Sequence, residues 1–106
     1  MNKIKITNKL VEKFADQSGD FNPIHLNENY SVTSLYGKRI AHGALVLNLI
    51  LRKFLKKNKI VINLKCFFIN PIYINDHLFI IKKTNGRNIE IAVKNKNSNL
   101  VLKIFY

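Results

Sequence analysis

The sequence has few of the residues that cross-link or interrupt a chain. Cys66 is its only cysteine among 106 residues, which excludes an intramolecular disulfide, a cysteine-rich metal site and a CxxC redox motif. Because Cys66 lies in an apolar run, we expect a small buried hydrophobe rather than a nucleophile. With two prolines and four glycines, the chain contains no Gly/Pro/Ser-rich tract that could serve as a linker. These features fit a reducing compartment.

Long hydrophobic runs are also lacking. Residues 1–6 alternate polar and apolar side chains and never build the apolar stretch of a signal peptide. The longest helical apolar run, Ala44 to Leu51, is interrupted by Asn48 and is far shorter than the roughly 20 residues that span a bilayer. We therefore expect no membrane span and a cytoplasmic location.

Acidic residues are scarce: 6 Asp and Glu face 18 Lys and Arg, for a net charge of +12. Such a charge can attract nucleic acid. Here the cations are scattered and mostly lysine, and aromatic residues are not interleaved with them as stacking platforms would be. Lys, Asn and Ile occur 15 times each, which fits a bias toward AT-rich codons. We expect no nucleic-acid partner, although the basic surface could attract an anionic small molecule.

Apolar residues make up 47% of the chain and are spread along it, which predicts a single compact domain over residues 1–106. Residues 3–7 alternate as a short strand does. A helix capped by Thr7 or Asn8 should follow and end near Gly19. We expect residues 20–25 to form an irregular loop, because Pro23 has no amide hydrogen. Asn27 can cap a short helix that ends before residue 37.

The second half of the sequence predicts one buried helix followed by strands. From Gly43 about four turns are apolar nearly all round at first, so this helix must be buried on several sides. The expected strands then cover residues 59–69, 71–84, 89–94 and 100–106. Turns are expected at residues 85–86 and 97–99. This order predicts an α+β fold in which a curved antiparallel sheet wraps one central helix.

Asp20 and His25 stand out in a polar cluster, residues 18–26, that interrupts the apolar chain. A carboxylate and an imidazole five residues apart on a constrained loop suit acid/base chemistry, because the two groups can bind one water between them. The competing interpretation is an ordinary loop aspartate with a structural histidine, a pair that also arises by chance.

A second polar cluster, residues 37–43, ends where the buried helix begins, at His42 and Gly43. Free amides and the positive end of the helix dipole at such a place can stabilise a developing oxyanion. Glycine also lets a substrate carbonyl approach the backbone closely. The alternative is that Gly43 only allows tight helix–sheet packing.

Taken together, Ser18-Gly19-Asp20-Phe21-Asn22-Pro23-Ile24-His25-Leu26 and the later Ile40-Ala41-His42-Gly43 resemble the hydratase signature of the MaoC-like and (R)-specific enoyl-CoA hydratases. Residues 67–78 resemble a later strand of that family, and the likeness runs from about residue 7 to the end. The resemblance implies a hot-dog fold, at least a homodimer, and a substrate tunnel at the dimer interface.

The resemblance also implies residue roles. It places the catalytic pair on Asp20 and His25, and the amide that polarises the thioester carbonyl on Gly43. Asn22, Ala41 and His42 fall at the substrate-binding positions beside them. We expect the Asn22 side chain to bond backbone groups. For His42 we favour a packed or capping residue over a proton carrier.

The implied reaction is syn addition or removal of water at the C2–C3 bond of an acyl thioester. Coenzyme A or the phosphopantetheine of an acyl carrier protein enters as part of the substrate, and no metal or redox cofactor is expected. Which of Asp20 and His25 is acid and which is base stays open.

Two departures from the family pattern carry expectations. Asn75 stands where glycine is usual, a mild change because asparagine tolerates left-handed geometry. The link over residues 56–59 is short, which together with bulky Phe67, Phe68 and Tyr73 predicts a shallow pocket for short acyl chains. Three alternatives stay open: a hot-dog thioesterase, an idle acyl-binding subunit, and a basic nucleic-acid-binding module.

Overall fold

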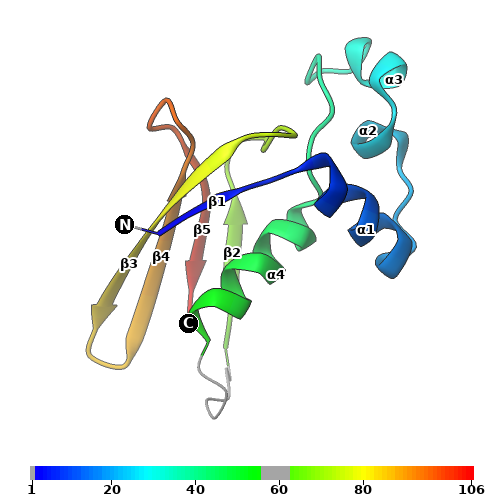
Figure 1. The fold of residues 1–106 in the computed structure, drawn as a ribbon. Coiled ribbons are helices and arrows are strands. Elements are labelled where there is room, and N and C mark those ends of the chain that lie inside the picture. Colours follow the sequence, from blue (N-terminus) through cyan, green and yellow to red (C-terminus); the bar gives the residue numbers. More distant parts are fainter. Residues whose placement is uncertain (1, 56–62) are drawn as a thin grey trace.

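A computed structural model describes residues 2–55 and 63–106 of the chain. Helices dominate the first half of the sequence and strands the second half (Figure 1). The elements are β1 (Asn2–Lys5), α1 (Asn8–Ser18), α2 (Pro23–Leu26), α3 (Glu28–Val32), α4 (Gly43–Phe54), β2 (Lys65–Phe68), β3 (His77–Asn85), β4 (Asn88–Lys94) and β5 (Leu100–Phe105).

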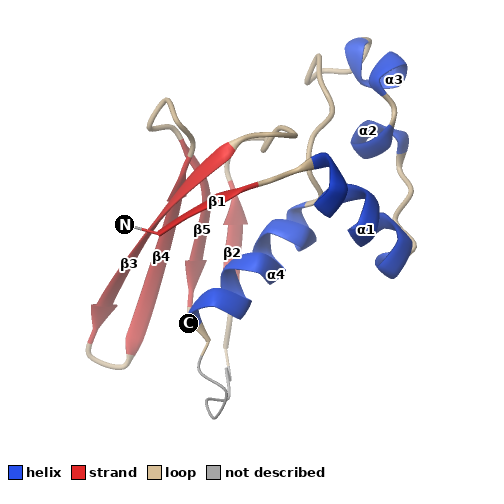
Figure 2. Cartoon of the chain, in the orientation of Figure 1, coloured by secondary structure: helices blue, strands red, loops and turns tan. Residues whose placement is uncertain are grey.

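The strands form one antiparallel sheet in the order β1-β3-β4-β5-β2, and α4 lies across one face of it (Figure 2). Val46 and Ile50 of α4 are fully buried in a single hydrophobic core cluster. Strand residues Leu78, Ile91 and Leu102 in that cluster are equally inaccessible to solvent. Removal of this apolar surface from water is the main force that holds helix and sheet together. The predicted arrangement of one helix on an antiparallel sheet is confirmed.

Helix α1 begins and ends where the sequence predicts. The Thr7 hydroxyl accepts a hydrogen bond from the Leu10 amide at 3.2 Å, so it fills one of the free amides of the first turn. Gly19 ends the helix at φ 78° and donates its amide to the Ala15 carbonyl at 2.9 Å. This left-handed turn redirects the chain away from the helix axis just before Asp20.

The strand predicted from residue 71 begins later, at His77. Over residues 71–76 the chain instead makes a turn, in which Tyr73 forms an isolated bridge with Ile40. The Asp76 carboxylate accepts the Tyr73 amide at 2.8 Å, and Asn75 takes the left-handed conformation at φ 73°. Asn75 therefore adopts the left-handed geometry that asparagine tolerates better than most residues.

Three further predicted boundaries shift. Helix α4 ends at Phe54. Within the described part of residues 59–69, only Lys65–Phe68 form a strand, β2. The short link over residues 56–59 lies outside the described residues. In the β3–β4 hairpin Asn85 pairs with Asn88, so the turn is one residue later than predicted, with Gly86 at φ 61°.

The two ends of the sheet differ in character. The β1 end carries the exposed lysines Lys3 and Lys5, which discourage further strand pairing. The β2 end carries Phe67 and Phe68, followed by Ile69, each about half exposed. Within the described ranges, no helix is both long and apolar enough to cross a membrane. The cytoplasmic location stays a prediction.

Candidate active site

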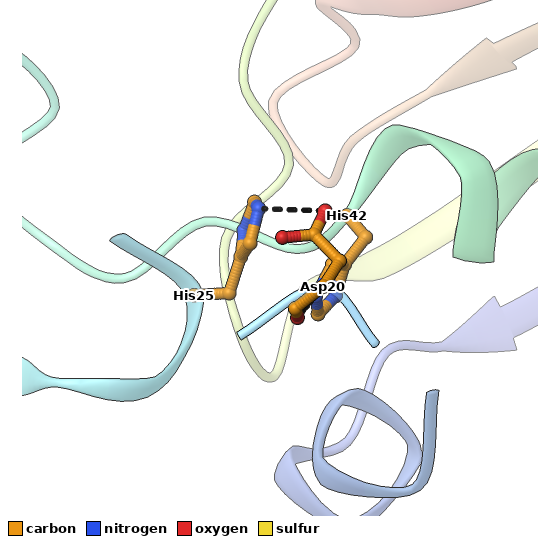
Figure 3. A group of neighbouring side chains, drawn as sticks. All are labelled: Asp20, His25 and His42. Carbon is orange, nitrogen blue, oxygen red and sulfur yellow. Dashed lines mark hydrogen bonds and ion pairs between the residues drawn. The ribbon is translucent and has the colours of Figure 1, made fainter. Parts of the chain in front are cut away.

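Three side chains from distant parts of the sequence meet beside the N-terminal end of α4 (Figure 3). Asp20 lies between α1 and α2, His25 lies in α2, and His42 directly precedes α4. One side-chain nitrogen or oxygen atom from each residue lies within 4.8 Å of those of the other two. The structure therefore brings together both members of the pair singled out in the sequence and adds a histidine from the second cluster.

The local fold around His25 differs from the predicted loop. Pro23 opens the short helix α2, and the Asn22 side chain caps it by accepting the Ile24 amide at 3.1 Å. Proline suits the first helical position because its fixed φ is helical and its missing amide hydrogen has no partner there anyway. The expected loop is thus wrong over residues 23–25. The expectation that Asn22 bonds the backbone is confirmed.

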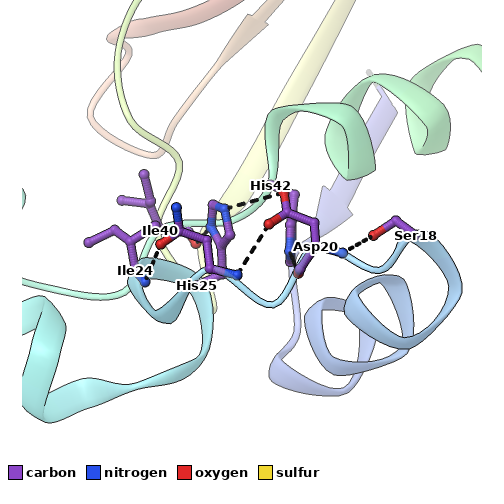
Figure 4. Close-up of polar contacts among 7 residues, drawn as sticks. Ser18, Asp20, Ile24, His25, Ile40 and His42 are labelled. Carbon is purple, nitrogen blue, oxygen red and sulfur yellow. Dashed lines mark hydrogen bonds and ion pairs between the residues drawn. The ribbon is translucent and has the colours of Figure 1, made fainter.

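Asp20 is held by a chain of local hydrogen bonds (Figure 4). Its amide donates to the Ser18 hydroxyl at 3.1 Å, and its Oδ1 accepts the Asn22 amide at 3.2 Å. Its Oδ2 lies 3.9 Å from the Nε2 atom of His25. Because the Asp20 side chain is 51% exposed, one carboxylate oxygen stays free to bind a ligand from solvent.

The ring of His25 has a defined orientation and tautomer. Its Nδ1 atom lies 2.8 Å from the Ile40 carbonyl oxygen. Since a carbonyl can only accept, Nδ1 carries the hydrogen and Nε2 of the neutral ring presents a lone pair toward Asp20. Burial lowers the pKa of His25, and nearby His42 adds to this, against the raising effects of the Ile40 hydrogen bond and of Asp20. The side chain is thus suited to act as a neutral base.

His42 is the buried member of the group, with 2% of its surface exposed. Its Nε2 lies 3.0 Å from the main-chain carbonyl oxygen of Asp20, so Nε2 carries the hydrogen. Its ring stacks on that of His25 with the ring centroids 3.9 Å apart. The centroid of the Phe14 ring lies 5.0 Å from the centroid of the His42 ring. The His42 side chain makes no capping bond to α4. Of the two roles favoured from sequence, packing is therefore the one observed.

Gly43 begins α4 next to an apolar pocket of about 430 Å³. The pocket walls include Ala41, Phe68 and Ile72. A Cβ atom on Gly43 would lie 2.9 Å from the Phe68 ring, so no larger residue fits without displacing that ring. The amide of Gly43 belongs to the first turn, where no carbonyl of its own helix can accept it. The packing and oxyanion interpretations of Gly43 are therefore compatible.

Arg39 contributes to the site in a way that sequence reasoning missed. Its Nε donates to the His25 carbonyl at 2.8 Å, and its Nη2 donates to the Asn8 side chain at 2.6 Å. The adjacent Ile40 holds the His25 ring, so two consecutive residues fix both its backbone and its imidazole. The sequence placed Arg39 in a polar cluster but gave no sign of a contact across 14 residues.

Asp20, His25 and His42 are also residue types that bind metal ions. The two imidazoles, however, stack with only 30° between their planes, and each already has one nitrogen bonded to a carbonyl. The nitrogen that remains on His42, Nδ1, is buried, and within the described residues it has no hydrogen-bond partner. A water between Asp20 and His25 fits this geometry better.

Comparison with known proteins identifies related sequences and folds. The family model described as "MaoC like domain" matches residues 1–103. A 3-hydroxybutyryl-CoA dehydratase from Methylorubrum extorquens is 44% identical over 48 residues, which cover 45% of this chain and 31% of the relative. The match thus spans about a third of the length of that curated relative.

Solved structures share the fold. An (R)-hydratase from A. caviae involved in PHA biosynthesis superposes with a TM-score of 0.84 at 20% identity, covering 98% of this chain and 87% of the other. The R-hydratase PhaJ1 from Pseudomonas aeruginosa gives 0.73 at 25% identity, covering 98% and 74%. These likenesses confirm the hot-dog fold. Because the family model matches residues 1–103 of this chain, the chain belongs to the MaoC-like domain family.

Proposed function

We propose that this protein is a hydro-lyase that adds water to, or removes it from, the C2–C3 bond of a short-chain acyl thioester. The reaction links a 2-enoyl thioester with its (R)-3-hydroxyacyl form. The observation that carries the proposal is the 3.9 Å separation between His25 Nε2 and Asp20 Oδ2. Both atoms accept hydrogen bonds, so one water placed between them can donate one hydrogen to each.

In the hydration direction, His25 Nε2 takes a proton from this water while the water oxygen bonds to C3. The electrons of the C2–C3 double bond move toward the thioester oxygen. The imidazolium then returns its proton to C2 as the thioester carbonyl re-forms. Asp20 accepts a hydrogen bond from the O–H that stays on the new hydroxyl group, and its charge stabilises the imidazolium. Since one base on one face handles the proton both times, the addition is syn.

The negative charge that develops on the thioester oxygen needs a donor. The amide of Gly43 is such a donor, because no carbonyl of its own helix can accept it in the first turn of α4 and it lies at the positive end of the helix dipole. A fixed donor of this kind typically accelerates acyl chemistry by about 10²–10³-fold. Coenzyme A or phosphopantetheine arrives with the substrate, and the net charge of +12 favours either phosphate-bearing carrier.

The proposal includes assembly of two copies along β2. This end of the sheet has an apolar edge at Phe67, Phe68 and Ile69, whereas the opposite end carries lysines. Phe68 also lines the pocket beside Gly43, so a second copy on β2 would help to enclose the substrate. We expect a dimer in sedimentation at micromolar concentration, and Phe67→Lys should weaken it. A monodisperse wild-type monomer that turns over substrate would contradict this assembly.

The test of the function is steady-state turnover of crotonyl-CoA and of (R)-3-hydroxybutyryl-CoA. We expect interconversion of the two, and loss of it in Asp20→Asn. The matched control is Asp16→Asn, which makes the same change at an exposed position of α1 and should keep full activity. Release of free thiol from the same substrates would indicate a thioesterase. Binding without turnover would indicate an idle acyl-binding subunit.

A further inference from the structure

His42 is a buried titratable residue that the proposed mechanism does not use. Its position directly before α4 is one where Ser, Thr, Asp or Asn normally caps the helix with a side-chain oxygen. His42 makes no such bond, and within the described residues its Nδ1 is buried without a hydrogen-bond partner. Both features lower the stability of the folded state, so the stability of the fold does not explain a histidine at this position.

The contacts of His42 supply that reason, since they reach both members of the proposed catalytic pair. Its Nε2–H donates to the main-chain oxygen of Asp20 at 3.0 Å. Its ring stacks on the His25 imidazole at a centroid distance of 3.9 Å. From the α1 side, Phe14 packs against it at 5.0 Å. One rigid, buried ring thus contacts the backbone of one reacting residue and the side chain of the other.

We propose that His42 is a positioning residue that sets the separation between Asp20 and His25. The inference rests on the proposed function, because it assigns His42 a role in the acid/base pair of that reaction. Misplacement of a reacting group by about 1 Å can cost roughly 10²-fold in rate, so a residue that fixes two such groups has a large effect on turnover.

The donor nitrogen of His42 belongs to this role. The bond to the Asp20 carbonyl requires a hydrogen on Nε2, so the ring cannot turn over without losing that bond. The other groups that face His25 are the Asp20 carboxylate, the Ile40 carbonyl and, at its backbone oxygen, the Arg39 guanidinium.

Two substitutions separate the contacts. His42→Gln keeps an N–H donor near the place of Nε2 but removes the stacked ring. His42→Phe keeps the ring but removes the donor. We expect kcat for crotonyl-CoA hydration to fall about tenfold or more in each, with KM changed less than about twofold. A rise in KM at unchanged kcat in both would overturn the proposal in favour of substrate binding by His42.

A double-mutant cycle tests the route of each effect. If His42→Phe acts through Asp20, it should lower the residual rate of Asp20→Asn much less than it lowers the wild-type rate. His42→Gln acts through the His25 ring, and because Asp20 and His25 act on one water, its effect should also shrink in the Asp20→Asn background. Full additivity of both substitutions with Asp20→Asn would contradict a positioning role.

Imidazole NMR of the wild-type protein needs no activity and no variant. It should report opposite tautomers, with the hydrogen on Nδ1 of His25 and on Nε2 of His42. If the wild-type protein does not hydrate crotonyl-CoA but shows these two tautomers, the proposed function is wrong, whereas the hydrogen bonds of His25 and His42 are confirmed. If the tautomers are not opposite, the positioning inference is wrong.

Discussion

Helix α2 and the N-terminal end of α4 each bring one histidine to the same point, and the two differ in what their nitrogens meet. His25 gives Nδ1 to the Ile40 carbonyl, which leaves Nε2 facing Asp20 and 12% of the side chain exposed. His42 gives Nε2 to the Asp20 carbonyl and is 2% exposed. In the proposed mechanism the two identical side chains serve as a base and as a support, because the carbonyl partner of each ring decides which nitrogen keeps its lone pair.

The largest expected effect comes from removing the reacting groups on the α2 side. His25→Ala and Asp20→Asn should each lower kcat/KM for crotonyl-CoA by at least about 10²-fold, the usual scale for a positioned acid or base. Since both act on one water, the double variant should be little worse than either single variant. Circular dichroism should report an unchanged fold. Near-normal turnover in both single variants would show that the catalytic assignment is wrong.

A smaller effect is expected at the α4 side, where Gly43 faces Phe68. In Gly43→Ala the new methyl group would collide with the Phe68 ring at 2.9 Å, so the ring must move and disturb the pocket. We expect a loss of about tenfold in kcat/KM. Adding Phe68→Leu should restore part of it, because the shorter side chain leaves room. If the double variant is as impaired as Gly43→Ala alone, the clash is not the cause.

The pocket beside α4 should limit the acyl chain. Each methylene that fits an apolar pocket gains about 0.8 kcal/mol, or roughly fourfold in kcat/KM. With Phe68 half-buried against Gly43, we expect kcat/KM to be best for chains of about four to six carbons and to fall beyond them. A series of 2-enoyl thioesters of increasing length measures this. A maximum of kcat/KM at about eight carbons or more would refute the shallow pocket but would not bear on the proposed chemistry of Asp20 and His25.

The smallest expected effect concerns how kcat/KM depends on pH through the pKa of His25. Catalysis needs neutral His25, and burial lowers the pKa of that side chain, so its base form persists below the usual value of about 6.5. The acid limb of kcat/KM should therefore lie below that pH. Asp20→Asn removes a group that raises the pKa of His25, so the limb of its residual activity should move to lower pH. A limb that moves upward would contradict this electrostatic picture.

Much of the fold could be predicted because local chemistry and tertiary packing agree. Thr7 and Gly19 bound α1 through capping bonds that depend only on neighbouring residues. Pro23 predicts a loop but in fact opens helix α2, because the proline ring that disrupts the interior of a helix is well suited to its first position. The strand expected from residue 71 fails for a related reason: the Asp76 side chain bonds the Tyr73 amide and makes a turn before β3.

The site was predictable in its residue types but not in its supports. Asp20 and His25 stand out because polar residues of that kind are rare in an apolar chain. The contacts that orient them come from Arg39, Ile40 and His42, across 14 to 22 residues, and in all three the acceptor is a main-chain oxygen. Every residue has a carbonyl, so no sequence pattern marks the one that fixes a tautomer.

The most direct test of the central claim is hydration of crotonyl-CoA by the wild-type protein in D₂O, with the product analysed by NMR. One base, His25, takes the proton from water and delivers it to C2 on the same face. The account predicts (R)-3-hydroxybutyryl-CoA with a single deuterium at C2, added syn to the hydroxyl group, and no such product from His25→Ala. Anti addition, or hydration that survives His25→Ala undiminished, would contradict it.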